Sequence, residues 1–159
     1  MDLLDEEFLR IWRTFEAKGL RYMMVGGFAV NLHGHFRTTG DLDIWIEDKI
    51  ENRRILRACL ADLNLGDFEA LETMDFIPGL TSISLFSGIE LDIMTYLKGY
   101  PQEAFNECLT LASLAEVNGI CIPFLHINHL IREKKLVNRE KDLADIEALK
   151  KIKRLREES

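Results

Sequence analysis

The sequence predicts one α/β domain in which a short mixed sheet is flanked by helices. Two observations predict this fold class: short apolar or alternating segments typical of strands are interleaved with segments of helical periodicity, and the chain ends in a long helical stretch. The 159 residues suffice for one domain with a hydrophobic core. We therefore expect residues 1–159 to form a single domain, with a core at about 20–97 and a C-terminal helical pair at about 126–156.

Two hydrophobic patterns place the individual elements. Apolar residues at helical spacing predict helices over residues 3–17, 27–34, 49–63 and 126–156, with a short helix beginning at Pro101. Short apolar or alternating runs predict strands over 21–25, 41–47, 81–87 and 90–96, the last two joined at Ser87–Gly88, and a second hairpin within 112–125 that turns at Asn118–Gly119.

Composition and charge exclude several classes of protein. No apolar run approaches the roughly 20 residues that span a bilayer, and the N-terminal MDLLDEEFLR is acidic where a signal peptide is basic, so we expect a cytoplasmic protein with no membrane partner. Three cysteines without metal-ligand spacing fit free thiols in a reducing compartment. The net charge of −7 argues against a protein that coats nucleic acid. Basic residues outnumber acidic ones after Arg132, where a solvated helix face is favoured over a polyanion site.

A group of aspartates is the strongest chemical signal. In the predicted strand 41–47, strict alternation puts Asp41 and Asp43 on one face of the sheet, with side-chain roots about 7 Å apart. In IELDIM the same alternation puts Asp92 on a strand face. If that strand lies beside 41–47, Asp92 becomes a third ligand, and the three carboxylates form the oxygen-rich site that Mg²⁺ (or Mn²⁺) prefers.

A glycine pair near the carboxylates indicates a phosphate-binding turn. Gly26 and Gly27 stand between a predicted strand and a predicted helix, where exposed backbone N–H groups and the helix dipole favour phosphate. Phosphate beside carboxylate-held metal ions is the arrangement for in-line displacement at phosphorus. The sequence therefore indicates chemistry at phosphorus.

These residues resemble a known superfamily. The order VGG, DLDI and then LDIM on a separate strand resembles the nucleotidyltransferases of the DNA polymerase β type, which include lincosamide and aminoglycoside nucleotidyltransferases. Within that superfamily, GGFAVNLHGHFRTTGDLDIWIE and LIREKKLVNREKDLADIEAL are similar to small bacterial proteins near the AbiE-type toxin group. The resemblance covers residues 20–97 and 126–150. It implies a polymerase β-like nucleotidyltransferase core.

The resemblance also implies a reaction. A nucleoside monophosphate would pass from an NTP, with ATP as the expected one, to a hydroxyl acceptor, and pyrophosphate would leave. Asp41, Asp43 and Asp92 would hold the metal, and Asp92 would also act as the general base. Gly26 and Gly27 match the motif that holds the triphosphate, although Gly27 stands where many members have serine, so one hydroxyl contact is missing.

Five further residues are candidates for nucleotide binding. Arg37 and Thr38 precede the aspartates on a loop that must pass near the phosphates, and the Arg37 fork suits phosphate or carboxylate. Lys134 falls in an apolar helical stripe, so it either contacts the triphosphate or carries its ammonium out to solvent. Lys141 and Asp142 lie near the start of a helix, where the acid suits the dipole, and the resemblance places both in an active-site signature.

The sequence leaves the acceptor open among a small molecule, RNA and protein. Two alternatives remain. One is a non-catalytic nucleotide-binding or regulatory module, and the other is a toxin that uses the same chemistry to modify RNA and has an antitoxin partner.

Overall fold

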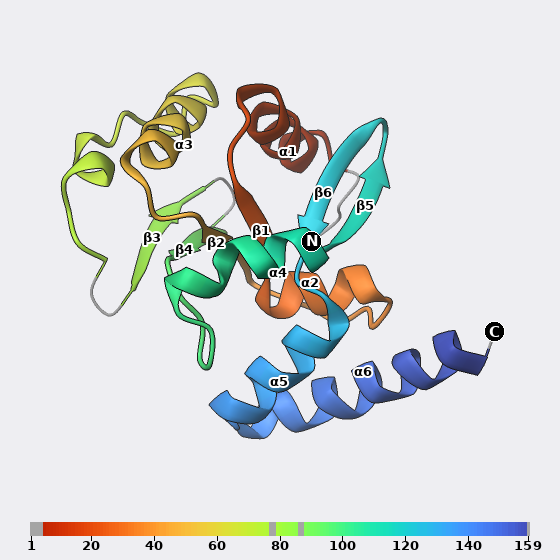
Figure 1. Ribbon diagram of the computed structural model, residues 1–159. Coiled ribbons are helices and arrows are strands. Elements are labelled where there is room, and N and C mark those ends of the chain that lie inside the picture. Colours follow the sequence, from red (N-terminus) through yellow and green to blue (C-terminus); the bar gives the residue numbers. More distant parts are fainter. Residues whose placement is uncertain (1–4, 77–78, 86–87, 159) are drawn as a thin grey trace.

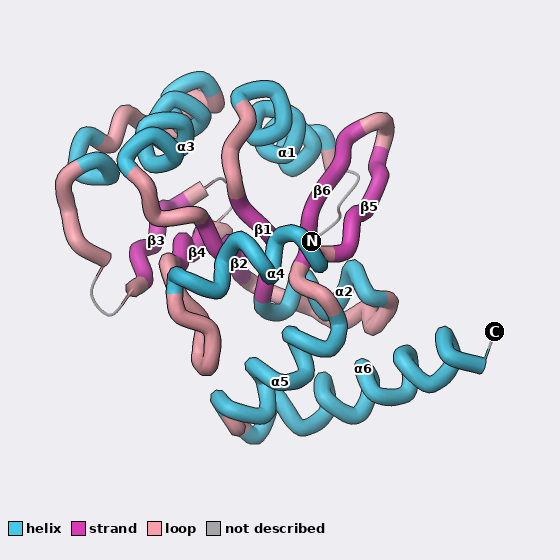
Figure 2. Tube along the Cα trace, viewed as in Figure 1, coloured by secondary structure: helices cyan, strands magenta, loops and turns pink. Residues whose placement is uncertain are grey.

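The fold is built on one mixed sheet. The computed structural model describes residues 5–76, 79–85 and 88–158. Within them the strands lie in the order β3-β4-β2-β1-β6-β5 (Figures 1 and 2). The helices and strands are α1 (Glu6–Lys18), β1 (Tyr22–Val25), α2 (Gly26–His33), β2 (Asp41–Ile46), α3 (Ile50–Asp62), β3 (Leu80–Ser84), β4 (Glu90–Met94), α4 (Phe105–Leu111), β5 (Ser113–Val117), β6 (Ile120–Phe124), α5 (Ile127–Val137) and α6 (Glu140–Glu158), with 3-10 turns at Glu69–Glu72 and Gln102–Ala104.

The alternation in β2 separates a core face from a polar face. Leu42, Ile44 and Ile46 are fully buried on the side that α1 and α3 cover (Figure 1). On the same side Tyr22 of β1, which pairs with Ile46, stacks against Trp12 of α1. The strand therefore presents its aspartates to the opposite side.

The aspartate side of the sheet carries the remaining helices. Trp45 of β2 packs edge-on against Phe105 of α4, and its indole N–H donates to the Thr95 carbonyl. Figure 1 shows α2, α5 and α6 on the side of the sheet opposite α1 and α3. The chain thus folds a helical pair in front of the ends of the strands that carry the aspartates.

The predicted hairpins both form. β3 and β4 pair antiparallel, while Ser87 of the predicted turn lies outside the described residues. β5 and β6 pair antiparallel around Asn118 and Gly119, which both have positive φ, as the two central residues of a tight hairpin turn require. The backbone N–H of Leu125, just after β6, donates to the Met24 carbonyl, so the second hairpin extends the sheet. This addition brings α5 and α6 to the site.

The predicted C-terminal helical pair is observed with a break between its members. α5 ends at Asn138, whose left-handed φ of 55° stops the helix, and α6 begins at Glu140. No helix in the described residues is long and apolar enough to cross a membrane.

Candidate nucleotide and metal site

Two carboxylates lie side by side at the centre of the polar face. β2 and β4 are parallel neighbours, and their register pairs Asp43 directly with Asp92 and Asp41 with Glu90. Adjacent strands are about 4.8 Å apart, so the two side chains share one patch of surface. Ser82, opposite Asp92 on β3, donates a hydrogen bond of 2.6 Å from its Oγ to Asp92 Oδ1 and fixes that carboxylate.

The pair is electrostatically unfavourable when no cation is present. Burial, together with the neighbouring carboxylates of Asp92 and Asp41, raises the pKa of Asp43 to about 7, and Arg139 opposes the shift. The raised pKa means that burial and the neighbouring carboxylates disfavour the ionised form of Asp43 more than Arg139 favours it. This is the electrostatic condition in which a divalent cation binds favourably.

Gly26 packs against the same carboxylate. Its φ is +63°, and a Cβ on it would lie 2.0 Å from Asp43 Oδ2. Residue 26 must therefore be glycine on two grounds, backbone conformation and space. Because Gly26 and Gly27 form the first turn of α2, their backbone N–H groups lie at the positive end of the helix dipole, beside the carboxylates.

The segment between α2 and β2 is anchored to the C-terminal helix. Arg37 donates from Nε to Asp145 Oδ1 and from Nη2 to Asp145 Oδ2, both at 2.7 Å. Its remaining terminal nitrogen donates to the Thr38 carbonyl. The predicted fork of Arg37 is thus engaged with a carboxylate of α6 rather than with Asp41, Asp43 or Asp92.

Lys134 points inward, and its ammonium does not escape to solvent. Only 2% of the residue is exposed, and Nζ lies 3.2 Å from Asp142 Oδ1 and 3.0 Å from Asp145 Oδ2. The alternative in which the ammonium reaches solvent is therefore wrong. The reason is that α6 places two buried carboxylates against α5, which a helical stripe alone does not reveal.

Asp142 and Asp145 are the acidic centre of this cluster. Burial alone would raise the pKa of Asp142, but hydrogen bonds from Arg139 and Lys134 outweigh it and lower that pKa to about 2. The pKa of Asp145 is also lowered, because hydrogen bonds from Arg37 and Lys134 outweigh its burial. Both acids are therefore ionised and hold three cations in place.

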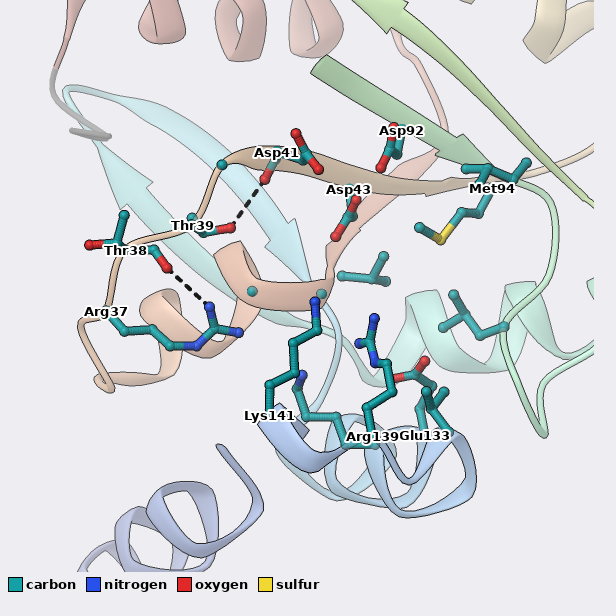
Figure 3. A pocket seen from close by; sticks show the side chains of 18 residues that line it. Arg37, Thr38, Thr39, Asp41, Asp43, Asp92, Met94, Glu133, Arg139 and Lys141 are labelled. Atoms are coloured by element: carbon teal, nitrogen blue, oxygen red, sulfur yellow. Dashed lines mark hydrogen bonds between the residues drawn. The ribbon is translucent and has the colours of Figure 1, made fainter. Parts of the chain in front are cut away.

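These parts enclose a cavity of about 580 Å³. Figure 3 shows the aspartates along one side and Arg139 and Lys141 rising toward them from the C-terminal helices. Of the predicted site residues the cavity is lined by Gly26, Gly27, Arg37, Thr38, Asp41, Asp43, Asp92, Lys134 and Lys141. Asp142 is not in the lining and lies behind it, against Lys134 and Arg139.

Four residues of the site with polar or charged side chains are absent from the predicted set: Thr39, Glu133, Arg139 and Asp145. Thr39 continues the segment that already includes Arg37 and Thr38, so its position was a usable signal. Arg139 follows the left-handed Asn138 in the break between α5 and α6, and the helical pattern over 126–156 does not locate that break. Asp145 pairs with Arg37 across the fold, and no local pattern encodes such a pair.

The carboxylates fit a divalent ion, although the structure does not hold them in a finished metal site. Within residues 5–76, 79–85 and 88–158, no three carboxylate, imidazole or thiol side chains converge as a ready metal-binding group. Asp43 and Asp92 are direct neighbours on adjacent strands. Asp41 lies two residues before Asp43 on β2 and is exposed. Their all-oxygen donor set and the raised pKa of Asp43 match a hard cation such as Mg²⁺.

Comparisons with known proteins place the fold. No family model matches the sequence, and no curated protein matches it. The lincosamide antibiotic adenylyltransferase LnuA, solved with lincomycin bound, is similar at a TM-score of 0.65 and 20% identity, over 93% of this chain and 97% of that one. An antigenic nucleotidyltransferase-like protein from Paracoccidioides brasiliensis is similar at a TM-score of 0.58 and 18% identity, over 90% and 74% of the two chains.

A third solved structure extends this agreement. ANT(2″)-Ia, in complex with adenylyl-2″-tobramycin, is similar at a TM-score of 0.51 and 16% identity, over 95% of this chain and 94% of that one. The narrower resemblance to the AbiE-type group stays a prediction. The chain shares the mixed α/β fold of these solved nucleotidyltransferase structures, and the fold class that its sequence predicted is confirmed.

Proposed function

We propose that this protein is a metal-dependent nucleotidyltransferase that moves a nucleoside monophosphate from an NTP to a hydroxyl acceptor and releases pyrophosphate. The observation that carries the proposal is the pairing of Asp43 with Asp92 on one side of a cavity whose other side carries cations. A triphosphate with bound metal needs both surfaces at once, negative for the metal and positive for the phosphates.

Each part of the site has a role in this proposal. Asp41, Asp43 and Asp92 would hold Mg²⁺ or Mn²⁺, which supplies positive charge to the oxygens of the reacting phosphate. The backbone N–H groups of Gly26 and Gly27 would bind the triphosphate. Four cationic side chains that line the cavity would orient the same phosphates, and the Thr38 hydroxyl would add a hydrogen bond. The four are Arg37, Lys134, Arg139 and Lys141.

Asp92 is the residue best placed to receive the acceptor proton. Its Oδ1 accepts from Ser82, which fixes the carboxylate without neutralising it, and β3 is the edge strand of the sheet. An acceptor can therefore approach from that edge while the nucleotide lies over the glycines. General-base catalysis needs such a carboxylate within hydrogen-bond reach of the attacking hydroxyl.

The class of acceptor is the next part of the proposal. LnuA is described with lincomycin and ANT(2″)-Ia with adenylyl-2″-tobramycin, and this chain covers nearly all of both. These neighbours support a hydroxylated small molecule as acceptor and ATP as donor. RNA modified by a toxin with an antitoxin partner is the competing acceptor.

The test is transfer of label from each of four α-labelled NTPs, with Mg²⁺ or Mn²⁺, into a cell extract separated into RNA, protein and small molecules. We expect label in the small-molecule fraction with wild-type protein and none with Asp43→Asn. Label in RNA would support the toxin instead. No label in any fraction, with NTP binding intact, would make the protein a non-catalytic binding module.

A further inference from the structure

The space over the second glycine of the pair is occupied by the segment before β2. Unlike Gly26, Gly27 does not have a left-handed backbone, so its conformation alone does not demand glycine. A Cβ on Gly27 would lie 2.8 Å from Thr39 Oγ1 and 3.1 and 3.2 Å from the terminal nitrogens of Arg37. A side chain from elsewhere in the chain thus fills the position that a side chain at residue 27 would take.

The side chain of Thr39 has fewer and longer hydrogen bonds than that of Arg37. In the described part of the chain its Oγ1 has one hydrogen bond, a long one of 3.3 Å to the Asp41 carbonyl. The three Arg37 nitrogens, in contrast, all donate to Asp145 or Thr38. Figure 3 shows the Thr39 side chain on the aspartate side of the cavity, between the Arg37 segment and Asp41. The hydroxyl of Thr39 is therefore a donor that a ligand can engage at small cost.

We propose that Thr39 binds the nucleotide, and that its hydroxyl donates a hydrogen bond to a phosphate oxygen lying over Gly27. This proposal rests on the proposed function, and it adds a substrate-binding residue outside the predicted set. A serine at residue 27 would donate a hydrogen bond to this phosphate from α2. In this chain the Thr39 hydroxyl would donate it instead, from the segment before β2. The Arg37–Asp145 pair anchors the segment and thereby fixes where the hydroxyl lies.

The occupied space makes a reciprocal substitution informative. Gly27→Ser alone should collide with Thr39 Oγ1, because contacts under 3.0 Å force one group to move. Thr39→Ala alone removes the hydroxyl and empties the space. The double variant G27S/T39A places a new hydroxyl into the vacated space. If the hydroxyl matters and not its source, the double variant should recover what each single variant loses.

The experiment is calorimetric binding of the four NTPs, as analogues with an unreactive α,β bridge, and of the matching nucleosides, in the presence of Mg²⁺. We expect Thr39→Ala and Gly27→Ser each to weaken analogue binding about 10- to 100-fold, the size of a lost hydrogen bond to a charged group. Nucleoside binding should stay unchanged, because the hydroxyl contacts phosphate. Thr39→Ser and the double variant should bind the analogue within a few-fold of wild type.

Controls separate this inference from the proposed function and from misfolding. Thr110→Ala removes a hydroxyl that bonds the Asn106 carbonyl on α4, away from the cavity, and should bind as wild type does. Thermal unfolding of each variant identifies a loss of fold. Wild-type protein that binds no analogue would overturn the proposed function and this inference together. Wild-type binding with Thr39→Ala equal to it, or a double variant no better than its parents, would overturn this inference alone.

Discussion

The Arg37 guanidinium and the Asp145 carboxylate form two hydrogen bonds of 2.7 Å although 108 residues separate them in the chain. The pair joins the segment before β2 to α6, and Asp145 also holds Lys134. One buried carboxylate therefore fixes two cations of the cavity. The C-terminal helices are part of the site rather than an appendage to it.

Breaking that pair should be costly for folding. Asp145→Asn leaves Arg37 and Lys134 with one anionic partner fewer, and breaking a buried ion pair typically costs about 3 kcal/mol. We expect a loss of this size in the free energy of unfolding measured in urea. The matched control is Asp62→Asn, which breaks the exposed pair with Lys18 at 2.8 Å and should cost far less, because solvent screens that pair. Equal losses in the two variants would show that Asp145 does not anchor the site.

Asp43 should lower the stability of the metal-free protein. Its carboxyl has a pKa of about 7 in the fold against 3.8 ordinarily, so the ionised form disfavours folding. The cost is absent below pH about 4, grows as pH rises to 7 and is fully present above 7. Asp43→Asn should therefore raise the free energy of unfolding at pH 8, by at most about 4 kcal/mol, and leave it unchanged at pH 4.

Unfolding measured with added Mg²⁺ distinguishes the electrostatic cost of the Asp43 carboxylate from a change in packing at residue 43. The ion should raise the unfolding temperature of wild-type protein at pH 8 and have little effect on Asp43→Asn, because the variant has lost a ligand. An Asp43→Asn variant that is less stable than wild type at pH 8 without metal would contradict the account of clustered, unneutralised carboxylates.

The burial of His33 predicts a second dependence of stability on pH, one that does not involve Asp43 or Asp92. Its Nε2–H donates to the Leu125 carbonyl at 2.8 Å, Arg156 faces Nδ1, and burial lowers the pKa of the ring to about 4. Because the neutral ring is the folded form, stability should be intact above pH about 6.5 and fall as pH drops toward 4. In His33→Gln the loss of stability between pH 7 and pH 5 should shrink, as urea unfolding at both values would show. An unchanged loss would mean that other groups govern acid stability.

Gly26 should tolerate no side chain. Gly26→Ala adds a methyl that would lie 2.0 Å from Asp43 Oδ2 and imposes a positive φ on alanine. Gly119→Ala is the matched control, since its φ is +78° and nothing lies within 4 Å of the new Cβ. The control should lose about 1 kcal/mol from backbone strain alone. Gly26→Ala should lose more than this in urea unfolding and should also lose Mg²⁺ binding, whereas equal behaviour of the two would show that Gly26 does not contact Asp43.

The sequence predicted the parts of this site that local geometry determines. Alternation in β2 and β4 was enough to put Asp41, Asp43 and Asp92 on strand faces, and the register confirms that Asp43 and Asp92 are neighbours. Gly119 marked a hairpin turn correctly, because a positive φ has a local residue signature.

The remaining features depend on contacts between distant segments. That Lys134 pairs with Asp142 and Asp145 follows from how α5 and α6 pack, and helical spacing alone left its ammonium free to point at phosphate or at water. The joining of β6 to β1 rests on a single register pair, Met24 with Phe124, which no sequence pattern announces. Arg139 was missed because the helical pattern over 126–156 does not show where the break between the two helices falls, which is at the left-handed Asn138.

The most direct measurement is binding of an unreactive ATP analogue by calorimetry, with Mg²⁺ and with EDTA, to wild-type protein and to Asp43→Asn. The account predicts binding to wild type that requires Mg²⁺ and weakens at least about 100-fold in the variant, because the paired carboxylates hold the metal that holds the phosphates. Binding that survives EDTA, or that is equal in the two proteins, would contradict a metal-held nucleotide at Asp43 and Asp92.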